Sequence, residues 1–181
     1  QKIHVAVGAE LVGGRASQHS CYTLLQIGHF DDNKGQEDAV KAAKLLVSEF
    51  NLDFHLFLVG ATEEDYADYI SDLIRKNGLE SYVSMVKYTT DISTYYEQAD
   101  VLLVCSRSET LSKVDIEAQK MGLPVIATDI EANKEQIQDN YNGILYKRGN
   151  VNDLASAINK LSDPILRRKM GENALNFMSD K

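Results

Sequence analysis

A chain of 181 residues, of which 44% are hydrophobic and 25% charged, is long enough to bury the core of one globular domain. Its formal net charge of -8 argues against a nucleic-acid-binding surface, because phosphate backbones select clustered Lys and Arg side chains. No apolar run is long enough to span a bilayer and no signal peptide is recognisable, so we expect a cytoplasmic protein with no transmembrane segment in this chain.

Apolar runs of strand length alternate with segments of helical periodicity along the chain. The predicted strands are Ile3–Val7, Leu24–Ile27, His55–Val59, Val83–Val86, Val101–Cys105, Pro124–Ala127 and Ile144–Tyr146. The predicted helices are about Gln36–Phe50, Glu63–Lys76, Ile92–Gln98, Lys113–Met121 and Val151–Leu161, and a last helix starts at Asp163–Pro164.

Runs such as VLLVC and PVIA are apolar on both faces, as the strands of a helix-covered parallel sheet are. Together with the alternating order of strands and helices, this predicts an α/β, Rossmann-like fold. We expect an open, mostly parallel sheet of about six strands with helices on both faces, formed as a single domain over residues 1–181.

Common cofactor and metal motifs are absent from the chain. No strand is followed by G-x-G-x-x-G, the dinucleotide fingerprint. The segment GAELVGGR, from Gly8 to Arg15, has the glycine spacing of a P-loop but lacks the Lys-Ser/Thr pair that holds phosphates and magnesium. The four histidines show neither HExxH nor Cys/His zinc spacing. We expect neither a metal nor a cofactor.

Ligands of an open α/β sheet bind at the carboxyl ends of its strands. The loop IGHFDDNKG leaves one strand at Gly28 and brings Lys34 to the start of a helix, where its ammonium group either pairs with a phosphate or is merely solvated. Gly60 makes a tight exit from another strand, which by itself explains a small residue. Lys87 and Tyr88 follow the next strand and either face a flat base or form an ordinary loop.

Two glutamates lie eight residues apart in SRSETLSKVDIEAQ, Glu109 in a loop and Glu117 in the next helix. Unpaired N–H groups at the helix start favour an anion such as phosphate. Glu117 can then accept both hydroxyls of a ribose, and Glu109 the hydroxyls of a group beyond the phosphates. The alternative is that Glu117 only pairs on its helix and Glu109 is exposed. The candidate backbone donors belong to Leu111, Ser112, Lys113 and Val114.

Six segments occur in the order found in a known protein family. They are KG after IGHFDDN, LVG after FHLF, YYEQADVLLVCSRSE, the E-x7-E spacing from Glu109 to Glu117, EAQKMGLPVIATD and KEQIQDNYNGILY. Over about residues 22–162 the chain thereby resembles the C-terminal domain of retaining glycosyltransferases with the GT-B fold, the large family-4 group.

The resemblance implies the donor-binding half of a longer two-domain enzyme. Such an enzyme takes a hexosyl group, with retention and without a metal, from a UDP-, GDP- or ADP-sugar to a glycan or lipid-linked acceptor held by a separate N-terminal domain. The full-length protein is then expected in the cytoplasm, where it can associate peripherally with a membrane. By resemblance, Lys34 contacts the diphosphate, Glu117 the ribose and Glu109 the transferred sugar, with Lys34 and Glu109 as the catalytic residues.

Three positions depart from the family's usual pattern. The family usually has Arg where this chain has His29, Gly where it has Ser112, and a Gly-Gly pair near Glu131–Ala132. A side chain at such a glycine blocks close backbone approach to phosphate, or adds strain where φ is positive. Two further interpretations stay open: a degenerate, non-catalytic module that binds a glycan or a partner, and a sugar-nucleotide epimerase of the same fold.

Overall fold

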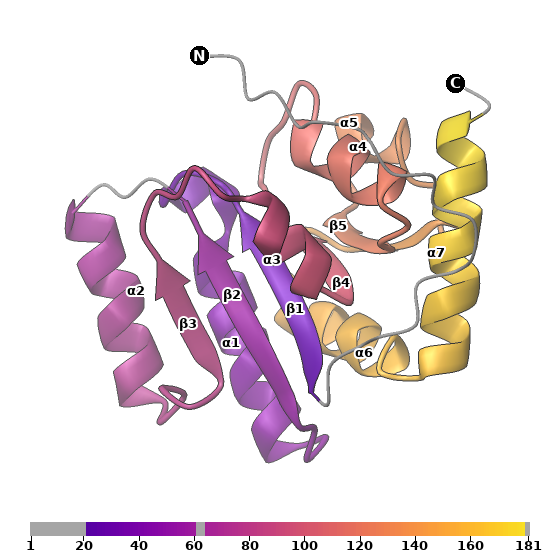
Figure 1. Cartoon of the computed structure of the whole chain (residues 1–181). Helices are drawn as coiled ribbons and strands as arrows, with labels where there is room; N and C mark the ends of the chain where they lie inside the picture. Colours follow the sequence, from indigo (N-terminus) through magenta and orange to yellow (C-terminus); the bar gives the residue numbers. More distant parts are fainter. Residues whose placement is uncertain (1–20, 61–63, 180–181) are drawn as a thin grey trace.

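The computed structural model describes residues 21–60 and 64–179, which form one α/β layer structure (Figure 1). The strands are β1 (Tyr22–Ile27), β2 (Phe54–Val59), β3 (Val83–Val86), β4 (Val101–Val104), β5 (Val125–Thr128) and β6 (Gly143–Tyr146). The helices are η1 (Asp32–Lys34), α1 (Gln36–Ser48), α2 (Glu64–Lys76), α3 (Ser93–Gln98), α4 (Lys113–Lys120), α5 (Glu131–Lys134), α6 (Val151–Lys160) and α7 (Pro164–Ser179).

The six strands form one sheet in the order β3-β2-β1-β4-β5-β6, and every pairing is parallel. This confirms the predicted Rossmann-like fold. The strand order reverses between β1 and β4, where Leu24 pairs with Val101 and Leu25 with Leu102. The predicted strand Ile3–Val7 lies outside the described residues.

Both faces of the sheet are covered by helices, which explains why its strands are apolar throughout (Figure 1). Leu24 and Leu103 belong to one buried cluster, together with apolar residues of α1, α2 and α6. Their strand neighbours Leu25 and Leu102 belong to a second cluster with Tyr96 of α3 and Ala118 of α4. Adjacent residues of a strand thus enter opposite cores, as the alternation of side chains requires.

Helix ends agree with the prediction to within about two residues, as expected for boundaries read from sequence. The first helix ends at Ser48 rather than Phe50, and the chain turns at Asn51, whose φ is 49°. The last helix begins at Pro164, and the carboxylate of Asp163 accepts the N–H of Ile165 at 2.8 Å. The short helix α5 was not predicted, because four residues are too few to show a helical period.

Helix α7 is tied to the amino-terminal ends of β1 and β4 by a mostly buried ion pair. The Arg167 Nε lies 3.4 Å from Asp100 Oδ1, and the two side chains are 11% and 9% exposed. The Arg167 guanidinium also lies 4.9 Å from the ring centroid of Tyr22. The second carboxylate oxygen of Asp100 accepts the N–H of Thr23 at 2.8 Å. This cluster lies at the amino-terminal ends of β1 and β4, and the candidate site lies at their carboxyl ends.

Candidate functional site

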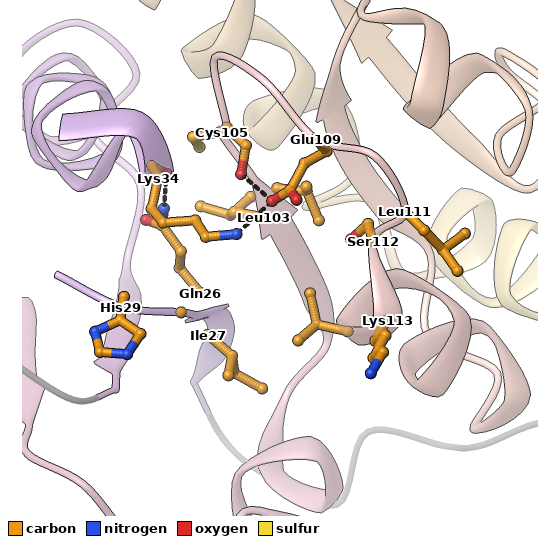
Figure 2. Close-up of a pocket in the computed structure, with 14 residues that line it drawn as sticks. Gln26, Ile27, His29, Lys34, Leu103, Cys105, Glu109, Leu111, Ser112 and Lys113 are labelled. Atoms are coloured by element: carbon orange, nitrogen blue, oxygen red, sulfur yellow. Dashed lines mark hydrogen bonds and ion pairs between the residues drawn. The ribbon is translucent and has the colours of Figure 1, made fainter. Parts of the chain in front are cut away.

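A pocket of about 290 Å³ opens at the carboxyl ends of β1 and β4, between the loops that lead into α1 and α4 (Figure 2). This is the point at which the strand order reverses, where open α/β sheets bind their ligands. The sequence-predicted site residues that line it are Gly28, His29, Lys34, Glu109, Leu111, Ser112, Lys113 and Val114.

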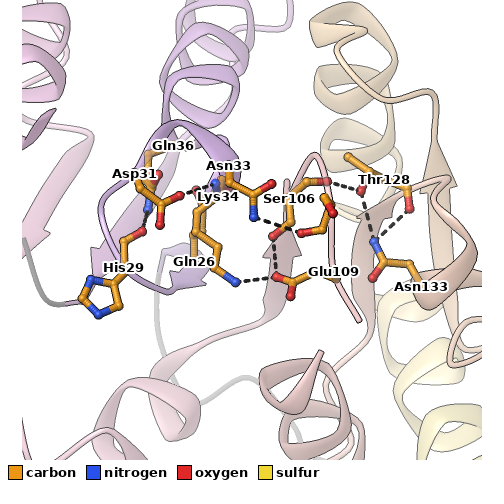
Figure 3. A network of polar contacts seen from close by, with 11 residues as sticks. Gln26, His29, Asp31, Asn33, Lys34, Gln36, Ser106, Glu109, Thr128 and Asn133 are labelled. Atoms are coloured by element: carbon orange, nitrogen blue, oxygen red, sulfur yellow. Dashed lines mark hydrogen bonds and ion pairs between the residues drawn. The ribbon is translucent and has the colours of Figure 1, made fainter. Parts of the chain in front are cut away.

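The loop between β1 and α1 is held in place by hydrogen bonds to its backbone (Figure 3). The Asp31 carboxylate accepts the Lys34 N–H at 3.0 Å, and the Gln26 Nε2 donates to the Lys34 carbonyl at 2.7 Å. Gly35 has a φ of 68°, and a Cβ there would lie 2.3 Å from the Cys105 carbonyl oxygen. Only glycine therefore allows this loop to pass so close to the end of β4.

Lys34 and Glu109 point toward one another across the pocket (Figure 2). The Lys34 Nζ lies 2.5 Å from Glu109 Oε1, and the side chains are 28% and 15% exposed. The Ser106 hydroxyl donates to the same carboxylate oxygen at 2.8 Å. Two residues far apart in the sequence thus form one hydrogen-bonded ion pair in the pocket.

A series of hydrogen bonds links the loop that carries Glu109 to β5 and α5 (Figure 3). The Thr128 hydroxyl donates to the Ser106 carbonyl at 2.7 Å. The buried Asn133 of α5 in turn donates to the Thr128 carbonyl and hydroxyl, at 2.9 and 3.1 Å. The short helix α5 therefore has a role in the architecture of the site, since it fixes the end of β5 against the loop that carries Glu109.

The start of α4 carries a buried hydroxyl group beside the pocket. Ser112 is the N-cap residue, but its side chain makes no capping hydrogen bond, although Ser commonly caps in this way. Ser112 is only 3% exposed, and its Oγ has no hydrogen-bond partner within residues 21–60 and 64–179. Its φ of -85° is ordinary for a residue with a side chain, so a serine at this position causes no backbone strain.

Glu117 follows Lys113 by about one helical turn, so both lie on the same side of α4. It does not line the pocket itself. Its Oε2 accepts a hydrogen bond of 2.9 Å from the hydroxyl of Tyr96 in α3. The side chain is half-buried, and it lies next to the pocket wall formed by Lys113 and Val114.

Gly60, Lys87 and Tyr88 lie outside this pocket, beyond the ends of β2 and β3. A Cβ at Gly60 would be 1.8 Å from the carbonyl oxygen of Gly28, so the contact between two strand ends explains this glycine. Lys87 is exposed, and Tyr88 is 71% exposed. Both residues follow β3, which is separated from β1 by β2.

The positions that depart from the family's usual pattern have distinct surroundings. The exposed ring of His29 lies apart from the Lys34–Glu109 pair (Figure 2). Glu131 and Ala132 form the start of α5, and the Glu131 carboxylate lies 2.8 Å from Lys134 Nζ. Glu131 and Ala132 thus lie in the first turn of a short helix.

Sequence reasoning did not single out several residues of the site. Gln26 and Ser106 line the pocket, and Tyr96 contacts Glu117 from another helix. A polar residue inside an otherwise apolar strand, such as Gln26 in YTLLQI, is a signal that could have found the first of them. The contact of Tyr96 depends on the packing of α3 against α4, for which the sequence carries no comparable signal.

Two negative findings concern the described residues alone. Among them, no group of three or more His, Cys, Asp or Glu side chains is arranged to hold a metal ion. None of the helices in the described ranges combines the length and apolar character needed to cross a bilayer.

Comparison with known proteins shows to which family the chain belongs. The family model for glycosyl transferases group 1 matches residues 15–177, nearly the whole chain. The chain belongs to this family. An uncharacterised glycosyltransferase from Haemophilus influenzae is 28% identical over 160 residues, which are 87% of this chain and 44% of that protein. The chain thus spans less than half the length of this relative.

Solved structures of glycosyl transferases have the same fold as this group 1 chain. A sucrose-phosphate synthase from Thermosynechococcus elongatus superposes with a TM-score of 0.81 at 27% identity, over 89% of this chain and 41% of that one. TarM from S. aureus, a mutant form solved with fondaparinux, alpha-GlcNAc-glycerol and UDP, gives a TM-score of 0.82 at 25% identity, over 96% and 36% of the two chains.

Proposed function

We propose that the chain is the donor-binding half of a retaining glycosyltransferase, which transfers a hexosyl group from a nucleotide-diphosphate sugar to a glycan or lipid-linked acceptor. The observation that carries the proposal is the pocket at the strand-order reversal, which brings Lys34, Glu109 and the start of α4 together. The acceptor is assigned to a part of the protein outside this chain, so the complete reaction belongs to the full-length enzyme.

The diphosphate fits between Lys34 and the start of α4. The first N–H groups of an α-helix have no partner within the helix and carry a partial positive charge, so they bind phosphate oxygens. Ser112, the N-cap residue of α4, lines the pocket at the same place, and its ordinary φ accommodates a side chain without strain. Lys113 lines the pocket beside it and adds a second cation. Ser112 is thus compatible with phosphate binding, although it replaces the family's usual glycine.

The two glutamates then face the two ends of the donor. Glu117 lies beyond the phosphate position along α4, where its carboxylate can accept the two ribose hydroxyls. Glu109 lies next to Lys34, where it can accept hydroxyls of the sugar. The base is then directed toward the loop at Lys87 and Tyr88, where Gly60 leaves the neighbouring strand.

In this proposal, catalysis rests on stabilising the leaving group. The bond between the anomeric carbon and the diphosphate oxygen breaks, and negative charge grows on the departing diphosphate. Lys34 and the helix N-terminus lie where that charge develops, and such preorganised donors supply a large share of the rate enhancement in many enzymes. No step of this proposal requires a metal ion or a nucleophile from this chain.

Calorimetric titration of the chain with UDP, GDP and ADP tests the proposal. UDP is the first probe, because TarM was solved with UDP and the chain resembles it in fold and sequence. We expect one of the three to bind with a stoichiometry of one. A chain that binds none of them, while circular dichroism shows an intact fold, would instead be the degenerate module considered above.

Lys34→Ala should weaken binding of that nucleoside diphosphate by about tenfold, because a charge-assisted hydrogen bond to phosphate is lost. The salt dependence of binding should also decrease, since one fewer cation faces the diphosphate. The control is Lys120→Ala, which removes the same charge from the exposed last turn of α4. Equal affinities of the two variants would show that Lys34 does not contact the phosphates.

Glu109→Gln should affect the binding of two ligands differently. The bare nucleoside diphosphate should bind about twofold to fivefold more tightly, because Lys34 is released from a partly exposed ion pair of about 0.5–1 kcal/mol. The intact nucleotide sugar should gain less or bind more weakly, because its hydroxyls lose a charged acceptor. Calorimetry with both ligands measures the difference, and Glu172→Gln, on the exposed side of α7, controls for net charge. A parallel change for both ligands would contradict contact of Glu109 with the sugar.

A further inference from the structure

A buried hydroxyl group from α3 meets the carboxylate of Glu117. Tyr96 is 1% exposed, and its ring belongs to the core on the face of the sheet that α3 and α4 cover (Figure 1). Its hydroxyl lies 2.9 Å from Glu117 Oε2 and 3.3 Å from the Val114 carbonyl oxygen. The contact joins two helices that are separated in the sequence by β4.

Burial explains why the Tyr96 hydroxyl has a hydrogen-bond partner, but it does not explain why the nearer partner is a carboxylate. A buried tyrosine hydroxyl needs a hydrogen-bond acceptor, and the Val114 carbonyl is already within reach. The nearer partner is nevertheless a carboxylate. Burial and the negative charge of Glu117 raise the pKa of Tyr96 well above its usual value, so the hydroxyl stays protonated and always donates. The direction of this hydrogen bond is therefore fixed.

The hydrogen bond restricts the side chain that faces the ribose position. A glutamate on a helix surface has several rotamers, and a ligand that needs only one of them loses affinity through the entropy of ordering. With Oε2 held by Tyr96, the carboxylate of Glu117 is oriented before a ligand arrives. The two lone pairs of Oε1 and the second lone pair of Oε2 remain as acceptor sites, which is enough for a pair of vicinal hydroxyls.

We propose that Tyr96 is a positioning residue, which holds Glu117 in the orientation that accepts the two hydroxyls of a ribose. This inference rests on the proposed donor-binding function and assigns no contact between Tyr96 and the ligand. Tyr96 acts only through Glu117. We therefore expect Tyr96 to affect ligand affinity only when both the Glu117 carboxylate and the ribose hydroxyls are present.

The test combines one variant with two ligands. The first ligand is whichever of UDP, GDP and ADP the unaltered chain binds most tightly, and the second is its 2′,3′-dideoxy form. Tyr96→Phe should weaken the first ligand by about fivefold, because an oriented acceptor is lost, and should leave the dideoxy form unchanged. Tyr95→Phe is the matched control, since it removes the hydroxyl of the neighbouring tyrosine, whose ring packs on Phe57.

A double-mutant cycle with Glu117 tests the same inference without the dideoxy ligand. In a Glu117→Ala background, Tyr96→Phe should cause no further loss of affinity, because the group that it positions is gone. Equal weakening of both ligands, or an undiminished effect in the Glu117→Ala background, would show that Tyr96 acts only on the fold and would overturn the inference. An unchanged affinity in Tyr96→Phe would overturn it as well. Failure of the unaltered chain to bind any of the three diphosphates would overturn the donor-binding proposal itself, which distinguishes the two failures.

Discussion

Replacing Glu117 by alanine is expected to weaken nucleoside-diphosphate binding by about ten- to a hundredfold, because charge-assisted hydrogen bonds worth about 1.5–3 kcal/mol are lost. The fold should survive, since Glu117 is only half-buried. Calorimetric titration measures the affinity and circular dichroism the fold. Glu117→Gln, which keeps the shape but not the charge, should fall between the unaltered chain and the alanine variant.

Glu172→Ala is the control for this experiment, because it removes a carboxylate from an exposed position of α7 far from the pocket. An unchanged affinity in Glu117→Ala, together with an intact fold, would mean that Glu117 only serves as the acceptor for Tyr96. The spacing of the two glutamates would then be structural.

Arg167→Ala is expected to lower the free energy of unfolding by about 3 kcal/mol, because it leaves the carboxylate of Asp100 buried without its cation. The variant also removes the guanidinium from the ring of Tyr22 and the hydrogen bonds of 2.8 and 3.1 Å to the Leu161 and Ser162 carbonyls. Urea unfolding followed by circular dichroism measures the change.

The matched control is Arg168→Ala, the next residue of α7, whose side chain is exposed. Its removal should change the free energy of unfolding by no more than about 0.5 kcal/mol, as is usual for surface substitutions. Similar unfolding midpoints for the two variants would show that the Arg167–Asp100 pair does not stabilise the attachment of α7. Nucleotide affinity of folded Arg167→Ala should be unchanged, because the pair lies at the amino-terminal ends of the strands and the pocket at their carboxyl ends.

The strands and long helices could be predicted from sequence because their pattern follows from burial. A strand such as β4, covered on both faces, must be apolar at every position, and a covering helix must repeat its apolar residues every three to four positions. The helix α5 has no such pattern, because tertiary hydrogen bonds from Asn133 to Thr128 hold it in place. Local periodicity does not report contacts of this kind.

The residues of the candidate site could be named individually, but their contacts could not. Strand ends and helix starts are local features, so Lys34, Glu109 and the start of α4 were identifiable from the sequence. The pairing of Lys34 with Glu109 depends on β1 and β4 being neighbours in the sheet, which the order of elements along the chain does not specify. The contact between Tyr96 and Glu117 likewise arises from the packing of two helices.

Lys34 and Glu109 form an ion pair in the pocket, although they lie 75 positions apart in the sequence. In the proposed reaction, a nucleotide sugar replaces both partners at once, since its diphosphate pairs with Lys34 and its sugar with Glu109. After transfer, the nucleoside diphosphate still contacts Lys34, but Glu109 has lost the sugar and faces a product of its own charge. Re-formation of the ion pair then competes with the product for Lys34, so this contact would speed product release and limit product inhibition.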